Sequence, residues 1–242
     1  MTAMVSRCLR CPVGSGTALL GCALVTATAL FVGCTRSVDG TVRAADGDAR
    51  PAGPIPLSDL LIEPRRFPAQ YPAVVLDPTS VYQAIRDIDG VDAGAIVTPP
   101  LCAPRAPGPS PQDAVAVQGV DTATSSSLTV AITRAATALS ARRDQLSACP
   151  SFTTTAAERS TTVTATVLPP RPVDADDSLA VEQTTSTSSG ENLRSLTLVA
   201  QVDDVQVAAA WRTASADAPP ETQSLDTLFT DAVLKVRRGG QP

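Results

Sequence analysis

The fold class is decided by the stretch Leu193-Arg-Ser-Leu-Thr-Leu-Val-Ala-Gln-Val202, Asp203-Asp204, Val205-Gln-Val-Ala-Ala-Ala-Trp-Arg212. Two apolar runs flank Asp203-Asp204, and aspartates at such a position are typical of a hairpin turn. The two carboxylates could instead act as a general acid and base, but adjacent residues of a strand point to opposite faces. The stretch therefore predicts two antiparallel strands joined by a tight turn.

The segments before and after this hairpin predict the rest of a sheet and its helices. Alternating or β-branched patterns indicate further strands at 114–120, 128–133, 161–167 and 179–185. Helices are expected at 78–89, 135–146 and 225–238. The first helix is the best defined, because Asp77 can cap it and Gly90 follows its end. Together these segments predict an α+β fold: an antiparallel sheet of about five to seven strands with helices mainly on one face.

The beginning of the chain has the features of a secretory signal peptide that ends at a lipidated cysteine. Arg7 and Arg10 form a basic start, and no further charge occurs up to Gly33. The small residue Gly33 directly before Cys34 resembles a bacterial lipobox, in which the cysteine takes a diacylglycerol and becomes the new N-terminus. We therefore expect residues 1–33 to be removed and Cys34 to carry the lipid.

Two alternatives to this interpretation stay open. Leu19-Leu20-Gly21-Cys22 matches a lipobox more closely, but cleavage there would leave an apolar segment on the mature terminus, so Cys34 is preferred. The apolar run also reaches the length of about 20 residues that an uncleaved transmembrane anchor needs, although several glycines dilute it. With lipid on Cys34, acyl chains would hold the protein at the outer face of the cell membrane.

Composition divides the chain into four parts and limits its partners. A signal peptide (1–33) precedes a segment (34–56) with few large apolar residues, which we expect to be a disordered tether. A single α+β domain (57–238) and a frayed tail (239–242) are expected to follow. The net charge of −5 and the lack of a basic patch argue against nucleic acid as a partner.

Catalysis has little support in the sequence. The chain contains no histidine, which excludes Ser-His-Asp and Cys-His machinery and every histidine-ligated metal site. The predicted domain also has no glycine-rich loop of the kind that binds phosphate. We therefore expect no catalytic residue, no metal site and no cofactor.

Two arginine pairs could belong to a binding site, and each has a structural interpretation that we prefer. Arg65-Arg66 could meet an anionic group, but they more simply form a solvated pair that flanks a buried Phe67. Arg142-Arg143 lie in a predicted helix and are expected on its exposed face. Neither pair is assigned to ligand binding.

Three acidic residues and the single tryptophan are interpreted in the same way. Asp174, Asp176 and Asp177 could gather Ca²⁺, but the spacing of an EF-hand is absent, which favours a solvated loop. Trp211 lies in a predicted strand and is expected in the core rather than in a ligand platform. No residue of this chain can therefore be assigned to a ligand from its sequence pattern.

Cys102 and Cys149 are the cysteines of the predicted domain, and two cysteines in an exported domain most simply form a disulfide. Cys102 ends Val97-Thr98-Pro99-Pro100-Leu101-Cys102, and Cys149 follows a predicted helix. This order resembles the extracytoplasmic sensor-like domain of mycobacterial lipoproteins and of a mycobacterial serine/threonine kinase. In that family a P-P-x-C loop is disulfide-linked to a cysteine at the end of a helix, beside a cleft in an α+β fold. The resemblance covers about residues 57–238 and implies sensing rather than catalysis.

The favoured hypothesis is a lipid-anchored envelope lipoprotein whose non-catalytic domain binds or senses a ligand. Its expected partners are the membrane, through acyl chains on Cys34, and an unidentified envelope ligand or protein. One alternative is a carrier of an apolar envelope lipid, which needs a sizeable apolar cavity. The other is a carboxylate-based envelope hydrolase, which needs two carboxylates that converge in a pocket, roughly 5–10 Å apart.

Overall fold

The computed structural model describes residues 55–104, 113–157, 159–215 and 218–239 of the chain. All of them belong to one structural unit. The expected signal peptide, both candidate lipidation sites (Cys34 and Cys22), nearly all of the tether and the last residues of the tail lie outside the described residues. Within the described ranges, no helix is both long enough and apolar enough to cross a bilayer.

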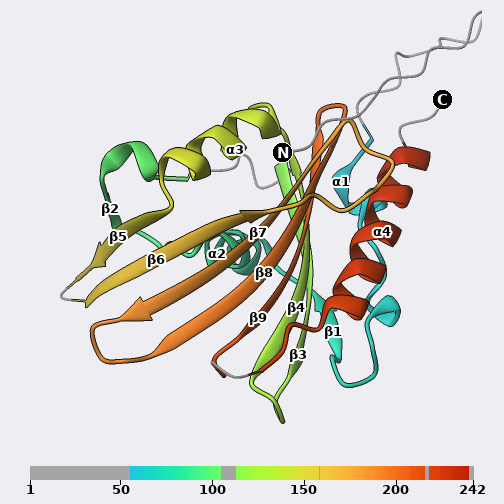
Figure 1. Cartoon of the computed structure of the whole chain (residues 1–242). Helices are drawn as coiled ribbons and strands as arrows, with labels where there is room; N and C mark the ends of the chain where they lie inside the picture. The colour runs from blue at the N-terminus through green and yellow to red at the C-terminus, as the bar shows by residue number, and fades with distance from the viewer. Residues whose placement is uncertain (1–54, 105–112, 158, 216–217, 240–242) are drawn as a thin grey trace, which may run out of the picture. The chain divides into compact units, whose positions relative to one another are not determined.

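The described residues form a nine-stranded sheet in which every neighbouring pair is antiparallel (Figure 1). Its order is β1-β3-β4-β9-β8-β7-β6-β5-β2. The strands are β1 (Ala73–Val75), β2 (Ile96–Thr98), β3 (Ala114–Asp121), β4 (Ser126–Arg134), β5 (Ser151–Ala156), β6 (Arg159–Leu168), β7 (Asp177–Thr187), β8 (Asn192–Val202) and β9 (Val205–Thr213).

The prediction of an α+β fold with an antiparallel sheet is confirmed, but the expectation of five to seven strands is wrong. The strands without a predicted range are β1, β2 and β5. Their lengths are three, three and six residues. The three-residue runs of β1 and β2 contain too few alternations to separate a strand from an extended loop.

The hairpin that was expected at Asp203-Asp204 is present between β8 and β9. Val202 pairs with Val205, which leaves the two aspartates as the turn. Asp203 has a φ of +52°, a left-handed conformation that aspartate tolerates better than most residues. The prediction of a turn at these residues is therefore confirmed.

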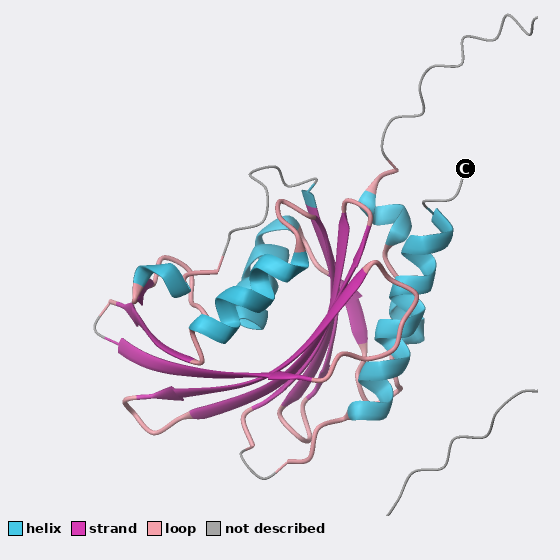
Figure 2. Cartoon of the chain, turned by 45° about the horizontal axis from the view of Figure 1, so that its top comes forward, coloured by secondary structure: helices cyan, strands magenta, loops and turns pink. Residues whose placement is uncertain are grey.

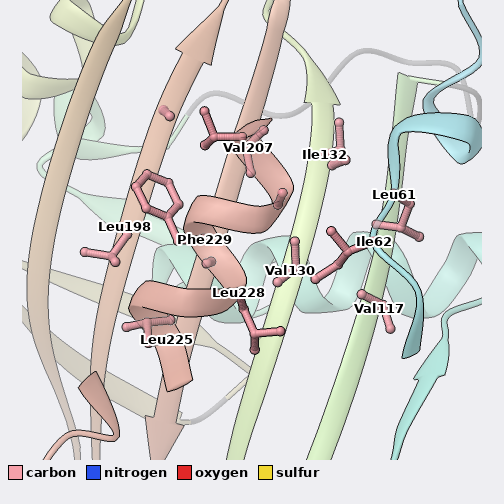
Figure 3. Packing of buried hydrophobic residues seen from close by; sticks show 14 of the residues in the cluster. Leu61, Ile62, Val117, Val130, Ile132, Leu198, Val207, Leu225, Leu228 and Phe229 are labelled. Carbon is pink, nitrogen blue, oxygen red and sulfur yellow. The ribbon is translucent and has the colours of Figure 1, made fainter. Parts of the chain in front are cut away.

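One face of the sheet carries helices α1 (Leu57–Leu60) and α4 (Thr222–Gly239) and the largest hydrophobic core. Figure 3 shows Leu225, Leu228 and Phe229 of α4 against the side chains of β4, β8 and β9. Trp211 belongs to the same core and is only 2% exposed, as expected from its place in a strand. Because α4 presents apolar residues at helical spacing, one of its faces is removed from water along most of its length.

The opposite face carries helices α2 (Pro78–Asp89) and α3 (Leu139–Ala148), so the expectation of helices mainly on one face is wrong (Figure 2). The reason is visible in β4. Val130 packs toward α4, whereas its neighbour Ala131 packs toward α2. Strands that are apolar on both sides are covered on both sides, and alanine is small enough to let a helix approach closely.

The two ends of α2 match the sequence prediction. The Asp77 carboxylate accepts hydrogen bonds from the backbone N–H groups of Thr79 and Ser80, at 3.0 and 3.2 Å. Gly90 follows the helix with a φ of +73°, where a Cβ atom would lie 3.2 Å from Val163. A larger residue is therefore disfavoured at this position both by conformation and by space.

The start of α3 differs from the predicted helix at 135–146. Strand β4 continues to Arg134, and the N–H of Ala135 donates a hydrogen bond to the carbonyl oxygen of Asp204 at 2.7 Å. The backbone at this point is held by the β8–β9 turn, so the helix begins only at Leu139.

Candidate functional site

A cavity of about 390 Å³ lies between α2 and α3, above the face of the sheet that these two helices cover. We call it the helix cleft. Its lining is Ile85, Ile88, Asp89, Leu101, Ala103, Pro104, Ala131, Thr133, Arg134, Ala136, Thr137, Leu139, Ala141, Arg142, Gln145, Val199, Gln206 and Ala208. Most of these residues are apolar. The polar ones are Asp89, Thr133, Arg134, Thr137, Arg142, Gln145 and Gln206.

The floor of the helix cleft is made of small side chains from three neighbouring strands. Ala131 of β4 pairs with Ala208 of β9, which pairs with Val199 of β8. All three side chains point to the same face, because residues that are paired across a sheet share a face. Two alanines in this row leave the space that larger residues would fill, so the cavity exists because of the sequence at this row.

One wall of the helix cleft is held by a chain of polar contacts that runs from α2 through α3 to the loop around Leu101 and Ala103. Arg142 of α3 binds Asp89 of α2, with 2.9 Å between Nη2 and Oδ1. Its Nη1 also donates to Oε1 of Gln145 at 2.7 Å. The Gln145 amide then donates to the carbonyl oxygens of Leu101 and Ala103, at 3.0 and 2.7 Å. A single connected network therefore sets the distance between α2, α3 and the loop.

The disulfide between Cys102 and Cys149 ties the same loop to the end of α3. Cys102 ends the short 3₁₀ helix η2 (Pro100–Cys102), and Cys149 caps α3. Both cysteines are buried, together with Val97 and Phe152. The expected pairing of the two cysteines is confirmed, and the loop is fixed by a covalent bond and by Gln145 together.

The charged side chains of the helix cleft are all engaged with other groups. Arg134 binds Asp204 at 2.8 Å and the carbonyl oxygen of Ile55, while Asp89 and Arg142 bind one another. Burial raises the pKa of the Asp89 carboxyl group, and the nearby guanidinium groups of Arg142 and Arg86 act in the opposite direction. Asp89 is the one carboxylate among the described residues of the lining.

The expectation that Arg142 and Arg143 form an exposed helix face is wrong. The Arg142 side chain is 22% exposed and lies in the wall of the helix cleft. Arg143 binds Asp177 at 2.5 Å and the carbonyl oxygen of Ser178 at 3.0 Å. Both arginines face acidic partners from other elements, which a pattern within one helix does not reveal.

The Arg65-Arg66 pair behaves largely as expected. Phe67 is buried beside it, at 7% exposure. Arg65 is exposed, whereas Arg66 forms an ion pair with Asp231 of α4. The 3₁₀ helix η1 (Pro64–Arg66) therefore attaches to α4 through Arg66 and to the core through Phe67.

The three aspartates that could have gathered Ca²⁺ bind arginines of two different helices. Asp176 binds Arg237 of α4 at 3.0 Å, and Asp174 lies 3.8 Å from the same guanidinium group. Asp177 instead binds Arg143 of α3. The structure thus divides the three carboxylates between two arginines on separate helices.

Sequence reasoning missed the residues that shape the helix cleft. Asp89 and Arg142 are 53 residues apart, and Ala208 gives no pattern at all. Of these residues, only Gln145 could have been found from the sequence, because it lies one helical turn before Cys149, the cysteine expected to form the disulfide. That position places a polar side chain beside the loop that the disulfide holds.

Comparison with known proteins found similarity only among solved structures. No protein-family model matches the chain, and no curated protein does. An uncharacterized protein of Mycobacterium smegmatis, the Rv0999 ortholog, has a TM-score of 0.42 and 14% identity, over 69% of this chain and 86% of that chain. The extracellular domain of PknH from Mycobacterium tuberculosis has a TM-score of 0.43 and 15% identity, over 74% of this chain and 98% of that chain. Both of these structures come from mycobacteria, and one of them is an extracellular domain.

Proposed function

We propose that this chain is a non-catalytic binding or sensing domain, that the helix cleft takes its ligand, and that acyl chains on Cys34 hold it at the outer face of the membrane. The observation that carries the proposal is the helix cleft itself. Its volume of about 390 Å³ lies within the range of roughly 300–1,000 Å³ that is typical of ligand sites. Its mainly apolar lining with a few placed polar groups is also typical of such sites.

The lining indicates a small ligand that is largely apolar. A charged ligand would have to separate Asp89 from Arg142, or Arg134 from Asp204, before it could use those groups. Leaving one member of a partly buried ion pair without its partner is unfavourable. An uncharged ligand can instead bury its surface against the alanines and isoleucines while the ion pairs stay intact.

The geometry favours binding over the two other functions considered. A carrier of an apolar envelope lipid needs a sizeable apolar cavity, and the volume of the helix cleft is near the lower end of the usual range for ligand sites. A two-carboxylate hydrolase needs a second acid, and the described lining of the helix cleft supplies only Asp89.

Replacing Ala208 with leucine is expected to block the helix cleft without unfolding the domain. Leucine would extend from the floor into the cavity, because Ala208 is partly exposed there. The uncharged fluorescent probe N-phenyl-1-naphthylamine should bind the purified protein, and Ala208→Leu should weaken binding by about tenfold or more. Ala123→Leu, in the exposed β3–β4 turn, is the matched control and should bind as the parent does. Equal affinity of a folded Ala208→Leu variant would show that the helix cleft is not the site.

Replacing Cys34 with serine is expected to abolish lipid attachment, since the thiol is the group that would take the diacylglycerol. The supporting observation is the small residue Gly33 before Cys34 at the end of the uncharged apolar run. Cells grown with an alkyne fatty acid should label the parent protein and the Cys22→Ser control, but not Cys34→Ser. Undiminished labelling of Cys34→Ser would move the attachment site to Cys22.

A further inference from the structure

A second concavity of about 460 Å³ lies on the same face of the sheet as the helix cleft, beyond the C-terminal end of α2. Thr154, Thr161, Thr185 and Thr187 form its floor, and we call it the threonine trough. Thr185 and Thr187 follow Leu179 and Val181 of β7 at even intervals. Since side chains alternate along a strand, these threonines share the face on which Leu179 and Val181 pack against α3.

The floor of the threonine trough is an ordered row of hydroxyl groups. Thr154 of β5 pairs with Thr161 of β6, which pairs with Thr187 of β7. Neighbouring strands are about 4.8 Å apart, so the three side chains repeat across the sheet at that interval. Thr154 and Thr161 are only 2% and 6% exposed, so they lie at the bottom of the trough rather than on an open surface. The Thr187 hydroxyl group already bonds to the Ser189 hydroxyl group at 2.8 Å and accepts from the N–H of Glu191 at 3.1 Å. A threonine hydroxyl group can donate one hydrogen bond and accept two, so Thr154, Thr161 and Thr185 are the floor residues proposed to bind a ligand.

The threonine trough is lined by charged groups of both signs. Arg159 and Arg212 lie in its lining, and so do Asp92 and Glu191. Arg212 is already bound to Asp87 of α2, with 2.8 Å between Nη1 and Oδ2. With Arg212 neutralised by Asp87, the charged groups that remain in the lining are Arg159, Asp92 and Glu191. The trough therefore offers both donors and acceptors and has no excess of positive charge, which disfavours an anionic ligand.

We propose that the threonine trough is a binding site for a neutral saccharide. A sugar hydroxyl both donates and accepts, so it can pair with threonine hydroxyl groups, with the Arg159 guanidinium group and with the carboxylates of the rim. No aromatic ring lines the trough in the described part of the chain, so recognition depends on hydrogen bonds. This site differs from the helix cleft in chemistry, and the proposal does not depend on the function assigned to that cleft.

The test is an NMR titration of the isotopically labelled protein with a panel of neutral disaccharides: maltose, cellobiose, lactose and mannobiose. At least one should give saturable shifts, up to tens of millimolar, in the amides of the trough floor and of Gly90. The double variant Thr161→Val, Thr185→Val keeps side-chain shape and removes two hydroxyl groups, so it should weaken binding by about tenfold or more. Thr164→Val is the matched control, because it lies on the exposed opposite face of β6 and should leave binding unchanged.

The outcomes are distinct. If the double variant loses its fold, Arg159→Gln at the exposed rim replaces it and should weaken binding by about fivefold. Any one of four results overturns the proposal: no saturable shift with any disaccharide, shifts confined to the helix cleft, binding of cellobiouronic acid alone, or cleavage of a disaccharide during the titration. The third would identify an anion site, and the fourth would identify Asp92 and Glu191 as candidate catalytic acids.

Discussion

Replacing both Cys102 and Cys149 with serine is expected to lower the free energy of unfolding by up to about 4 kcal/mol. The bridge closes a loop with a sequence separation of 47 residues, and the lost chain entropy of a loop this long corresponds to about that value. Besides the bridge, the loop on the Cys102 side is held by the Gln145 amide, which donates to the carbonyl oxygens of Leu101 and Ala103. The N–H groups of Cys102 and Ala103 bond only to the nearby carbonyl oxygens of Pro99 and Pro100.

Loss of the disulfide should loosen the wall of the helix cleft first, because Leu101, Ala103 and Pro104 form part of that wall. Urea unfolding gives the stability change, and hydrogen exchange of Cys102 and Ala103, compared with and without reductant, reports the loop. Leu101→Ala is the control, because this side chain is 64% exposed in the same loop and its loss leaves the bridge intact. Unchanged exchange in the reduced protein would mean that Gln145 alone holds the loop.

Replacing Phe229 with alanine is expected to lower the free energy of unfolding by about 3–5 kcal/mol. Phe229 is 1% exposed and lies at the centre of the core between α4 and the sheet (Figure 3). Removing the ring leaves a cavity that β8 and β9 cannot collapse to fill, because each is held by backbone pairing on both sides. A domain of this size has a total stability of about 5–15 kcal/mol, so the change is a large share of it.

Urea unfolding measures the change in the free energy of unfolding, and two further variants test whether the lost apolar volume causes it. Phe229→Leu should lose roughly half as much, because it keeps most of the apolar volume. Thr230→Ala lies at the exposed next position of α4 and should change stability by less than about 0.5 kcal/mol. Equal losses at positions 229 and 230 would contradict the assigned face of α4.

The elements with local signals could be predicted from the sequence. Helix α2 follows from Asp77 and Gly90, because capping is an interaction between neighbouring residues. The β8–β9 turn follows from Asp203-Asp204, and α4 follows from its apolar stripe. Each of these patterns lies within a single turn or a single helix, so it can be recognised without knowing which distant residues the segment contacts.

The second covered face of the sheet and the helix cleft could not be predicted in the same way. Ala131 and Ala208 form no recognisable pattern in the sequence. Nevertheless, the small size of Ala131 allows α2 to pack closely on the sheet, and both alanines form the floor of the helix cleft. The contact of Asp89 with Arg142 depends on how two helices lie on the sheet, and neither residue signals the other. A site built by small residues and by pairs from distant segments leaves no periodic pattern to detect.

The two outer strands of the sheet have a consequence for how copies of this protein behave beside one another. Strands β1 and β2 have three residues each, Pro72 precedes β1, and Pro99 follows β2. An open sheet edge can recruit a strand of a second molecule, but proline has no N–H group to donate and a three-residue edge offers few partners. Crowded copies should therefore resist edge-to-edge aggregation, even though apolar residues such as Val74 are exposed at that edge.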